Sequence, residues 1–161
     1  MAIVCLIIAN NDDSGNIMID SSTDYAAMTG IWLKSSLDAH SFISREFWHS
    51  HVEAMKDKYL PGCENYAYTD EDTGRMCGFI SLRGDHIEAL FVDPDCQGKG
   101  IGKALLAYAA SLRDRLTLSV YTKNTRAAEF YRRNGFIAEE RHTDPATGED
   151  ELIMVRQGDL S

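Results

Sequence analysis

A glycine-rich turn, Gln97-Gly98-Lys99-Gly100-Ile101-Gly102-Lys103, sets the strongest limit on the fold, because it lies directly between a strand-like and a helix-like segment. Glycines let the backbone approach a ligand closely, and a helix start offers unpaired N–H groups and a positive dipole end. Such a turn suits a phosphate or pyrophosphate. Its G-x-G-x-G spacing excludes both the P-loop, which needs Ser or Thr after Gly-Lys, and the dinucleotide fingerprint G-x-G-x-x-G.

Composition and charge bound the possible partners. At 161 residues, 44% hydrophobic and 25% charged, the chain fits one globular domain. Its net charge of −9 argues against nucleic acid as the main partner. Between Gln97 and Arg133, eight basic residues stand against two acidic ones, a net of +6 that leaves −15 for the rest. One region therefore suits an anion and the remainder suits cations.

Cysteine and histidine spacing gives no sign of a metal or disulfide site. The chain has four cysteines: Cys5, Cys63, Cys77 and Cys96. None forms a C-x-x-C pair, so we interpret them as reduced thiols of a cytoplasmic protein. His49 and His51 lie two residues apart, which on a helix directs them to different sides, and we expect no metal.

The amino-terminal residues 1–16 precede the predicted domain. The apolar run Ala2–Ala9 has no Lys or Arg before it and is too short to span a bilayer, so we expect neither export nor membrane insertion. Residues 1–16 are then an extension, either an extra strand or a stretch upstream of a natural start at Met18. We expect the domain itself to span residues 17–157.

Hydrophobic periodicity and turn residues predict the element order β-α-α-β-β-β-α-β-α-β-β. The predicted strands are Ile17–Asp20, Asn65–Thr69, Arg75–Leu82, His86–Val92, Leu116–Tyr121, Phe136–His142 and Glu151–Arg156. The predicted helices are one with an apolar stripe from Tyr25 to Ser35, then Ser44–Tyr59, Gly100–Arg113 and Thr125–Asn134. This mixture of hairpins and crossovers predicts a single α/β domain, with a mixed central sheet of about six to seven strands and helices on both faces.

Two motifs carry a resemblance to a known family. Leu90-Phe91-Val92-Asp93-Pro94 leads to Gln97-x-x-Gly100-x-Gly102. Downstream, Asn-x-x-Ala-x-x-Phe-Tyr-x-x-x-Gly-Phe is matched by Asn124, Ala127, Phe130, Tyr131, Gly135 and Phe136. Both motifs resemble those of the GNAT superfamily of acyl-CoA N-acyltransferases. The resemblance spans about Ile17 to Arg156 and is nearest to small bacterial members akin to the ribosomal-protein N-terminal acetyltransferases.

The resemblance implies an acetyl-CoA-dependent N-acetyltransferase with the GNAT fold. Backbone N–H groups from Gln97 through Lys103 would hold the CoA pyrophosphate, with Lys99 and Lys103 adding charge. Main chain of Leu90–Val92, Phe91 included, would run beside the pantetheine arm and polarise the thioester carbonyl. Asn124 would bind the pantetheine, and Tyr131 would face the sulfur as general acid. The alternative for Tyr131 is a core aromatic on the buried side of a helix.

The acceptor side is less defined. Glu88 is the candidate base because it lies on the strand leading to the CoA loop, and His86 is a weaker candidate. A solvent-facing or ion-paired carboxylate is the alternative for Glu88. In the family the connection between the first two helices often lines the acceptor site, so His40 and Phe42 are candidate substrate-binding residues. A helix N-cap and a side chain that fills the hydrophobic core explain His40 and Phe42 equally well.

The expected reaction is direct attack of a primary amine in a ternary complex, since Cys96 lies away from the expected thioester. The amine could belong to a protein N-terminus, a lysine or a small molecule. A lysine is neutral fewer than about one time in a thousand at pH 7, so it needs a base or a desolvating site. We expect no nucleic acid or membrane partner, and a monomer or homodimer. The alternative function is a non-catalytic acetyl-CoA-binding or sensing module.

Overall fold

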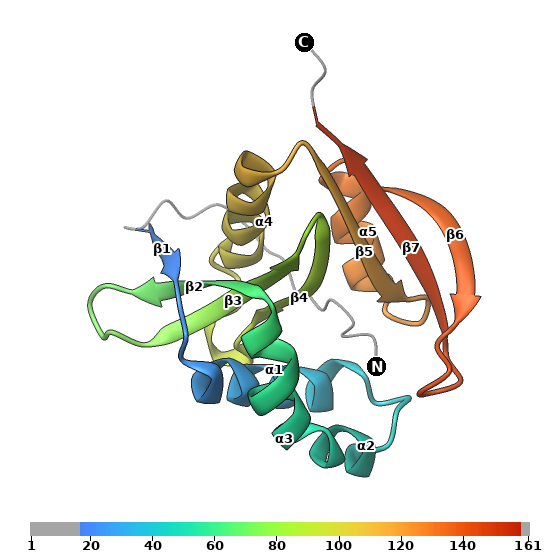
Figure 1. Cartoon of the computed structure of the whole chain (residues 1–161), viewed down its shortest axis with the longest axis horizontal. Helices are drawn as coiled ribbons and strands as arrows, with labels where there is room; N and C mark the ends of the chain where they lie inside the picture. The colour runs from blue at the N-terminus through green and yellow to red at the C-terminus, as the bar shows by residue number, and fades with distance from the viewer. Residues whose placement is uncertain (1–16, 159–161) are drawn as a thin grey trace.

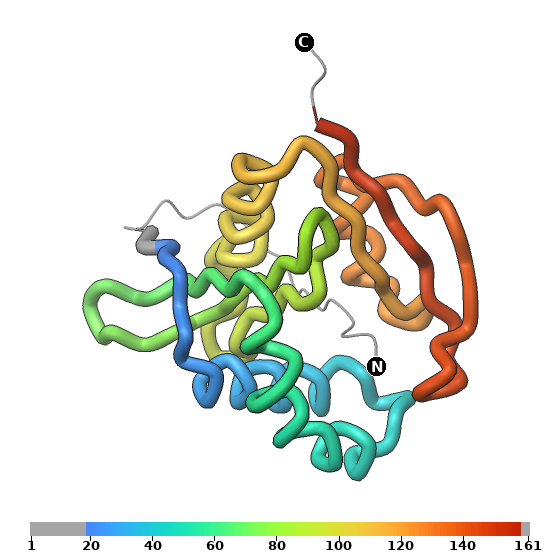
Figure 2. Tube along the Cα trace, viewed as in Figure 1, coloured from blue at the N-terminus to red at the C-terminus, as the bar shows by residue number. Residues whose placement is uncertain are grey.

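The chain folds around one seven-stranded sheet, seen in a computed structural model that describes residues 17–158 (Figures 1 and 2). The strands are β1 (Ile17–Ser21), β2 (Glu64–Asp70), β3 (Met76–Arg83), β4 (His86–Val92), β5 (Arg115–Tyr121), β6 (Ile137–Thr143) and β7 (Asp150–Gln157). Their order in the sheet is β1-β2-β3-β4-β5-β7-β6, and every neighbouring pair is antiparallel except β4 and β5. The predicted mixed sheet is confirmed. The interpretations offered for residues 1–16 lie outside the described residues.

Three of the α-helices begin at a side-chain cap. The helices are α1 (Tyr25–Ala39), α2 (Arg45–Ser50), α3 (Val52–Ala54), α4 (Ile101–Leu112) and α5 (Thr125–Arg133), with a π-helical turn at Met55–Tyr59 and 3-10 turns at Leu60–Gly62 and Pro94–Cys96. The Asp24 side chain accepts a hydrogen bond from the Ala27 N–H, and Ser44 accepts one from the Phe47 N–H. Such side chains satisfy N–H groups that the helix leaves unpaired, so the sequence alone locates these starts.

The prediction of one helix over Ser44–Tyr59 is wrong, because the helix is interrupted at His51. The Phe47 carbonyl would normally accept the N–H of His51. Instead it accepts the Ser50 hydroxyl at 2.7 Å and lies 2.7 Å from the His51 ring Nδ1. The His51 N–H turns to the carbonyl of Trp48 at 3.1 Å. Side-chain hydrogen bonds have therefore replaced the helical one.

The parallel strands β4 and β5 part along most of their length (Figure 1). Within the described residues their ladder consists of His86↔Thr117 and Ile87↔Leu118. On the other side of β4, Ser81 pairs with Ala89 and Leu82 with Ile87, so Glu88 is an extra residue. A bulge bends a strand and increases its twist. The bulge at Glu88 thus directs the second half of β4 away from β5.

Separate hydrophobic clusters cover the two faces of the sheet. One joins the sheet to α4 and α5 and includes Leu90 and Val92 of β4. The other joins it to α1 and α2 and includes Phe91. Helices therefore lie on both faces, as predicted. Gly78 of β3 allows the close approach of α4, because a Cβ there would lie 3.2 Å from Ile101 Cγ2 and 3.3 Å from Leu105 Cδ1 of that helix.

Three further findings concern only residues 17–158. No helix there combines the length and apolarity needed to cross a bilayer. No group of three or more His, Cys, Asp or Glu side chains there could hold a metal ion. Cys63, Cys77 and Cys96 are free thiols. The domain bounds of 17–157 stay a prediction.

Candidate active site

The glycine-rich turn has a backbone conformation that only glycine adopts readily. Gly98 has φ 85° and Gly100 has φ 73°, in the left-handed region. Gly100 is the N-cap of α4, and its lack of a side chain leaves the helix start without a side-chain cap among the described residues. The first N–H groups of the twelve-residue α4 are therefore available to an anion. Lys99 and Lys103 are exposed beside them.

A network of four charges holds the chain just before this turn. The Asp93 carboxylate accepts hydrogen bonds from Lys34 of α1 at 3.1 Å and from Arg75 at 2.8 Å. It also accepts the Asp95 N–H at 2.9 Å. Burial alone would raise the pKa of Asp93, but the three donors together lower it below its usual range. The network, which we call the Asp93 clamp (Lys34, Arg75, Asp93 and Asp95), ties α1 and the β2–β3 hairpin to the start of the turn.

The main chain of Leu90–Val92 lies in the half of β4 that has left β5. All three side chains are buried in the two clusters, which leaves the backbone as the part of these residues that can meet a ligand. The Val92 carbonyl accepts the Ser35 hydroxyl of α1 at 3.2 Å. The carbonyl of Val92 is thus already committed to α1.

The structure brings together His40, Phe42 and Asn124, which sequence reasoning had assigned to different ligands. Asn124 caps α5, because its Oδ1 accepts the Ala127 N–H at 3.2 Å. Its Nδ2 must then donate to His40 Nε2, 3.2 Å away. The His40 ring also stacks on Trp48 at 5.4 Å and meets Phe42 edge-on at 5.5 Å. His40 therefore links the α1–α2 connection to the start of α5.

The hydrogen bond from Asn124 fixes the form of the His40 ring. Since Nε2 accepts, the proton lies on Nδ1, which is buried without a hydrogen-bond partner among the described residues. Burial lowers the pKa of His40 to about 4. The imidazole is therefore neutral at physiological pH.

Tyr131 lies on α5 with its side chain fully buried. Its ring packs edge-to-face against Phe130 and Phe136, each with a centroid separation of 5.4 Å. The side chain belongs to the cluster under α4 and α5. This environment excludes water from the phenol and fits both predicted alternatives, a core aromatic and a shielded acid.

The candidate bases, Glu88 and His86, lie next to the paired part of β4 and β5, where the two strands begin to separate. Glu88 is the bulged residue, and one carboxylate oxygen lies 3.6 Å from the Arg83 Nε. His86 Nδ1 lies 2.6 Å from the Thr117 hydroxyl across the β4–β5 ladder. Burial lowers the pKa of His86 against the opposing effect of Glu88. Both side chains therefore have protein partners.

Sequence reasoning missed three buried polar residues, Tyr121, Asp144 and Glu151, of which Tyr121 meets the His40 ring edge-on at 5.4 Å. The Tyr121 hydroxyl donates to the buried Asp144 carboxylate at 2.7 Å, and Glu151 is 3% exposed beside them. Burial raises the pKa of Tyr121 far above its usual value, with Asp144 and Glu151 raising it further and the Thr147 hydroxyl lowering it by less than burial raises it. One signal was present in the sequence, since alternation along the last strand places Glu151 on the same face as Ile153 and Val155. A carboxylate in an apolar row indicates burial.

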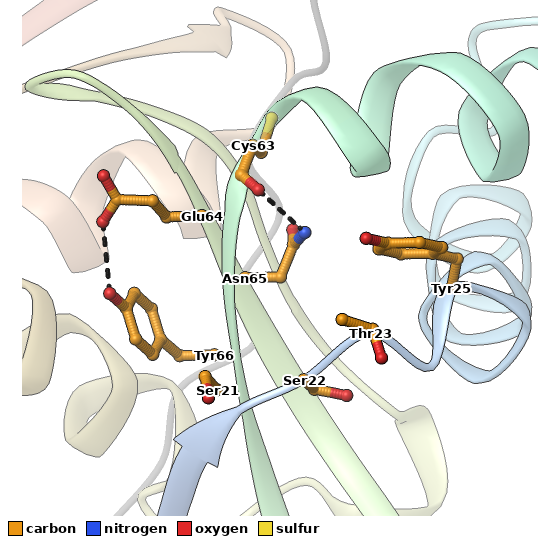
Figure 3. Close-up of a pocket in the computed structure, with 8 residues that line it drawn as sticks. All are labelled: Ser21, Ser22, Thr23, Tyr25, Cys63, Glu64, Asn65 and Tyr66. Carbon is orange, nitrogen blue, oxygen red and sulfur yellow. Dashed lines mark hydrogen bonds between the residues drawn. The ribbon is translucent and has the colours of Figure 1, made fainter.

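A pocket of about 430 Å³ opens where β1 ends and β2 begins (Figure 3). It is lined by Ser21, Ser22, Thr23, Tyr25, Cys63, Glu64, Asn65 and Tyr66. The Tyr66 hydroxyl donates to Glu64 at 3.1 Å, and the Asn65 amide donates to the Cys63 carbonyl at 3.2 Å. None of the eight lining residues was predicted for the site.

Comparison with known proteins gives a consistent result. Residues 62–138 match the family described as acetyltransferase (GNAT) domain. The chain is 35% identical over 115 residues to peptidyl-lysine N-acetyltransferase YiaC of Escherichia coli (strain K12), covering 71% of this chain and 77% of that protein. The solution structure of apo-form YjaB from Escherichia coli aligns with TM-score 0.78 and 29% identity, over 89% of this chain and 99% of that one.

The ribosomal-protein-S18-alanine N-acetyltransferase from Escherichia coli shares the same fold. Its crystal structure aligns with TM-score 0.61 and 24% identity, over 90% of this chain and 96% of that one. At this identity the likeness concerns the fold alone. The shared fold is consistent with the resemblance to ribosomal-protein N-terminal acetyltransferases that the motifs indicated.

Proposed function

The chain belongs to the GNAT family of acetyltransferases and is an N-acetyltransferase, and from this premise we propose that it moves the acetyl group of acetyl-CoA to the side-chain amine of a lysine in a protein or peptide. The name of the YiaC relative supports a lysine acceptor. The charge of −15 outside the Gln97–Arg133 region supports a cationic one. We place the enzyme in the cytoplasm, which the free thiols support.

The parting of β4 from β5 in front of the uncapped start of α4 carries the proposal. The residues there fit acetyl-CoA: the turn from Gln97 to Lys103 would bind the pyrophosphate through N–H groups and two lysines. Main chain of Leu90–Val92 and the side chain of Asn124 would orient the pantetheine arm. When bound, acetyl-CoA supplies an acetyl group activated as a thioester.

The residues of the chain would then handle protons and exclude water. Tyr131 would return a proton to the leaving thiolate, since a phenol of pKa about 10 can protonate a thiolate whose conjugate acid has a pKa of about 8.5. His40 and Phe42 would line the acceptor side, and Glu88 stays the sequence-based candidate base. No acyl-cysteine is needed, so the amine attacks directly in a ternary complex.

The test begins with calorimetric titration of acetyl-CoA into the wild type and Gly100→Glu. A glutamate at the helix start would place a carboxylate where the pyrophosphate binds, so saturable binding should be lost. CoA release with lysine peptides is then measured for the wild type and Tyr131→Phe. Binding without transfer to any amine would favour the sensing module, and absence of binding by folded wild type would refute the proposal.

A further inference from the structure

A row of polar side chains crosses β5, β7 and β6 on the same side of the sheet as α1 and α2. Glu151 of β7 pairs in register with Tyr121 of β5 and with His142 of β6, and paired residues direct their side chains to the same face. Tyr121 belongs to the cluster under α1, with its ring 5.4 Å from His40 and 5.6 Å from Phe42. Glu151 therefore lies on the strand next to Tyr121, and the Tyr121 ring contacts both residues predicted for the acceptor.

The Glu151 carboxylate is buried with one oxygen uncommitted. Its Oε1 lies 3.0 Å from His142 Nε2, whereas Oε2 is buried without a hydrogen-bond partner among residues 17–158. The neighbouring Asp144 is occupied, because it accepts the Tyr121 hydroxyl at 2.7 Å and the Ala146 N–H at 2.9 Å. A buried carboxylate oxygen costs free energy unless a proton or a donor meets it. This oxygen is thus suited to receive either one.

The charges around Glu151 make it a better base than an exposed carboxylate. Burial raises the pKa of Glu151, the negative charge of Asp144 raises it further, and His142 lowers it by a smaller amount. The charge of Asp144 also makes the surroundings favourable for a cation. His142 has 47% of its side chain exposed, which gives the buried carboxylate a route to solvent through the imidazole ring.

Resting on the lysine acceptor proposed above, we infer that Glu151 binds the ammonium of that lysine and takes its proton, with His142 as the exit to solvent. The part-exposed ring of Phe42 would contact the hydrocarbon stem, since lysine packs its methylenes on apolar surface while its charge meets an anion. Glu88, by contrast, has the Arg83 guanidinium as its partner.

The proton transfer is balanced. One N–H bond of the ammonium breaks and one O–H bond forms on Glu151 Oε2, leaving a neutral amine and a neutral carboxylic acid. After the carboxyl group turns, the proton passes to His142 Nε2, which is the unprotonated nitrogen of the Nδ1–H tautomer, and the resulting imidazolium releases its Nδ1 proton to water. An exposed lysine of pKa about 10.4 would keep its proton, but desolvation among aromatic rings lowers that pKa toward the pKa of the acid.

The first experiment measures kcat/KM for acetylation of poly-L-lysine against pH, with wild type, Glu151→Gln and Glu149→Gln. Glu149 is the matched control, because it lies two residues away and pairs with Lys123 at 3.0 Å. We expect Glu151→Gln to lose about 10²–10⁴-fold at pH 7. The loss should shrink as pH rises and the lysine deprotonates without help. Glu149→Gln should keep the wild-type profile.

The second experiment measures binding without acetyl-CoA. Calorimetry compares a blocked alanyl-lysyl-alanine peptide with its norleucine counterpart, which lacks the charge. Wild type should prefer lysine, and Glu151→Gln should bind the two equally. If circular dichroism shows that Glu151→Gln is unfolded, His142→Gln tests the same proton relay at a half-exposed residue. For His142→Gln we expect a decrease in the acetylation rate that is confined to low pH.

The outcomes separate this inference from the proposed function. Wild type that acetylates poly-L-lysine while Glu151→Gln keeps both its rate at pH 7 and its preference for lysine would overturn the inference alone. The inference would also be overturned if Glu88→Gln lost its activity at low pH and Glu151→Gln kept it. Wild type that acetylates no lysine would refute the proposed function and, with it, the role of Glu151.

Discussion

Replacing Asp93 by Asn should separate the buried centre of the Asp93 clamp from its exposed rim. The Asp93 side chain is 9% exposed, whereas Lys34 and Arg75 are 47% and 48% exposed. Hydrogen bonds to charged groups contribute about 1.5–3 kcal/mol each, but both cations can regain water when the carboxylate is neutralised. Asn also keeps an acceptor for the Asp95 N–H. We therefore expect a loss of about 2 kcal/mol in the free energy of unfolding.

The matched control is Asp95→Asn. Asp95 pairs with the same two cations, but its side chain is 61% exposed, so its neutralisation should change the melting temperature by less than about 1 °C. For Asp93→Asn the expected decrease is about 4–8 °C, measured by circular dichroism. Calorimetry should also show weaker acetyl-CoA binding, because Asp93 holds the chain entering the phosphate turn.

The pH dependence follows from the lowered pKa of Asp93. Its stabilisation is present above the unfolded-state pKa of about 3.9 and is lost as pH falls through the folded-state value. The difference in melting temperature between wild type and Asp93→Asn should therefore be constant above about pH 5 and shrink below about pH 4. Equal effects of Asp93→Asn and Asp95→Asn at pH 7 would refute this reasoning.

Four other substitutions test the fold and the site. Gly78→Ala should lower the free energy of unfolding, measured by chemical denaturation, by about 1–3 kcal/mol, because its Cβ would lie 2.9 Å from a backbone oxygen. Gly30→Ala should raise that free energy by about 0.5–1 kcal/mol, because the residue is helical and its Cβ would have no atom within 4 Å. His40 has a folded-state pKa of about 4, below the unfolded value of about 6.5, so wild type should lose roughly 3 kcal/mol as pH falls from about 6.5 to 4. His40→Gln should show a flatter pH dependence, and an equal slope would contradict the assignment of a neutral buried ring. Asn124→Asp keeps the cap acceptor but places a carboxylate on His40 Nε2, so nuclear magnetic resonance should report a raised pKa for His40, and an unchanged value would exclude the contact.

The sequence by itself located the parts whose structure depends on neighbours along the chain. The strand His86–Val92 has the predicted bounds, because a turn at Gly84-Asp85 and the Asp93-Pro94 pair limit it locally. The start of α5 follows from Asn124, whose cap spans three residues. The glycine turn and the two motifs together identified the family.

Tertiary structure alone decided which of these residues meet and what surrounds them. The bulge at Glu88 depends on how β4 pairs with β3, and the parting from β5 follows from it. His40 and Asn124 are 84 residues apart in the chain, and neither motif nor periodicity encodes their contact. Alternation along the last strand indicates that Glu151 is buried, but its pairing with Tyr121 and His142 arises only when β7 lies between β5 and β6. Local sequence sets hydrogen bonds within a few residues, whereas long-range packing sets burial, and burial determines the proton affinity of these groups.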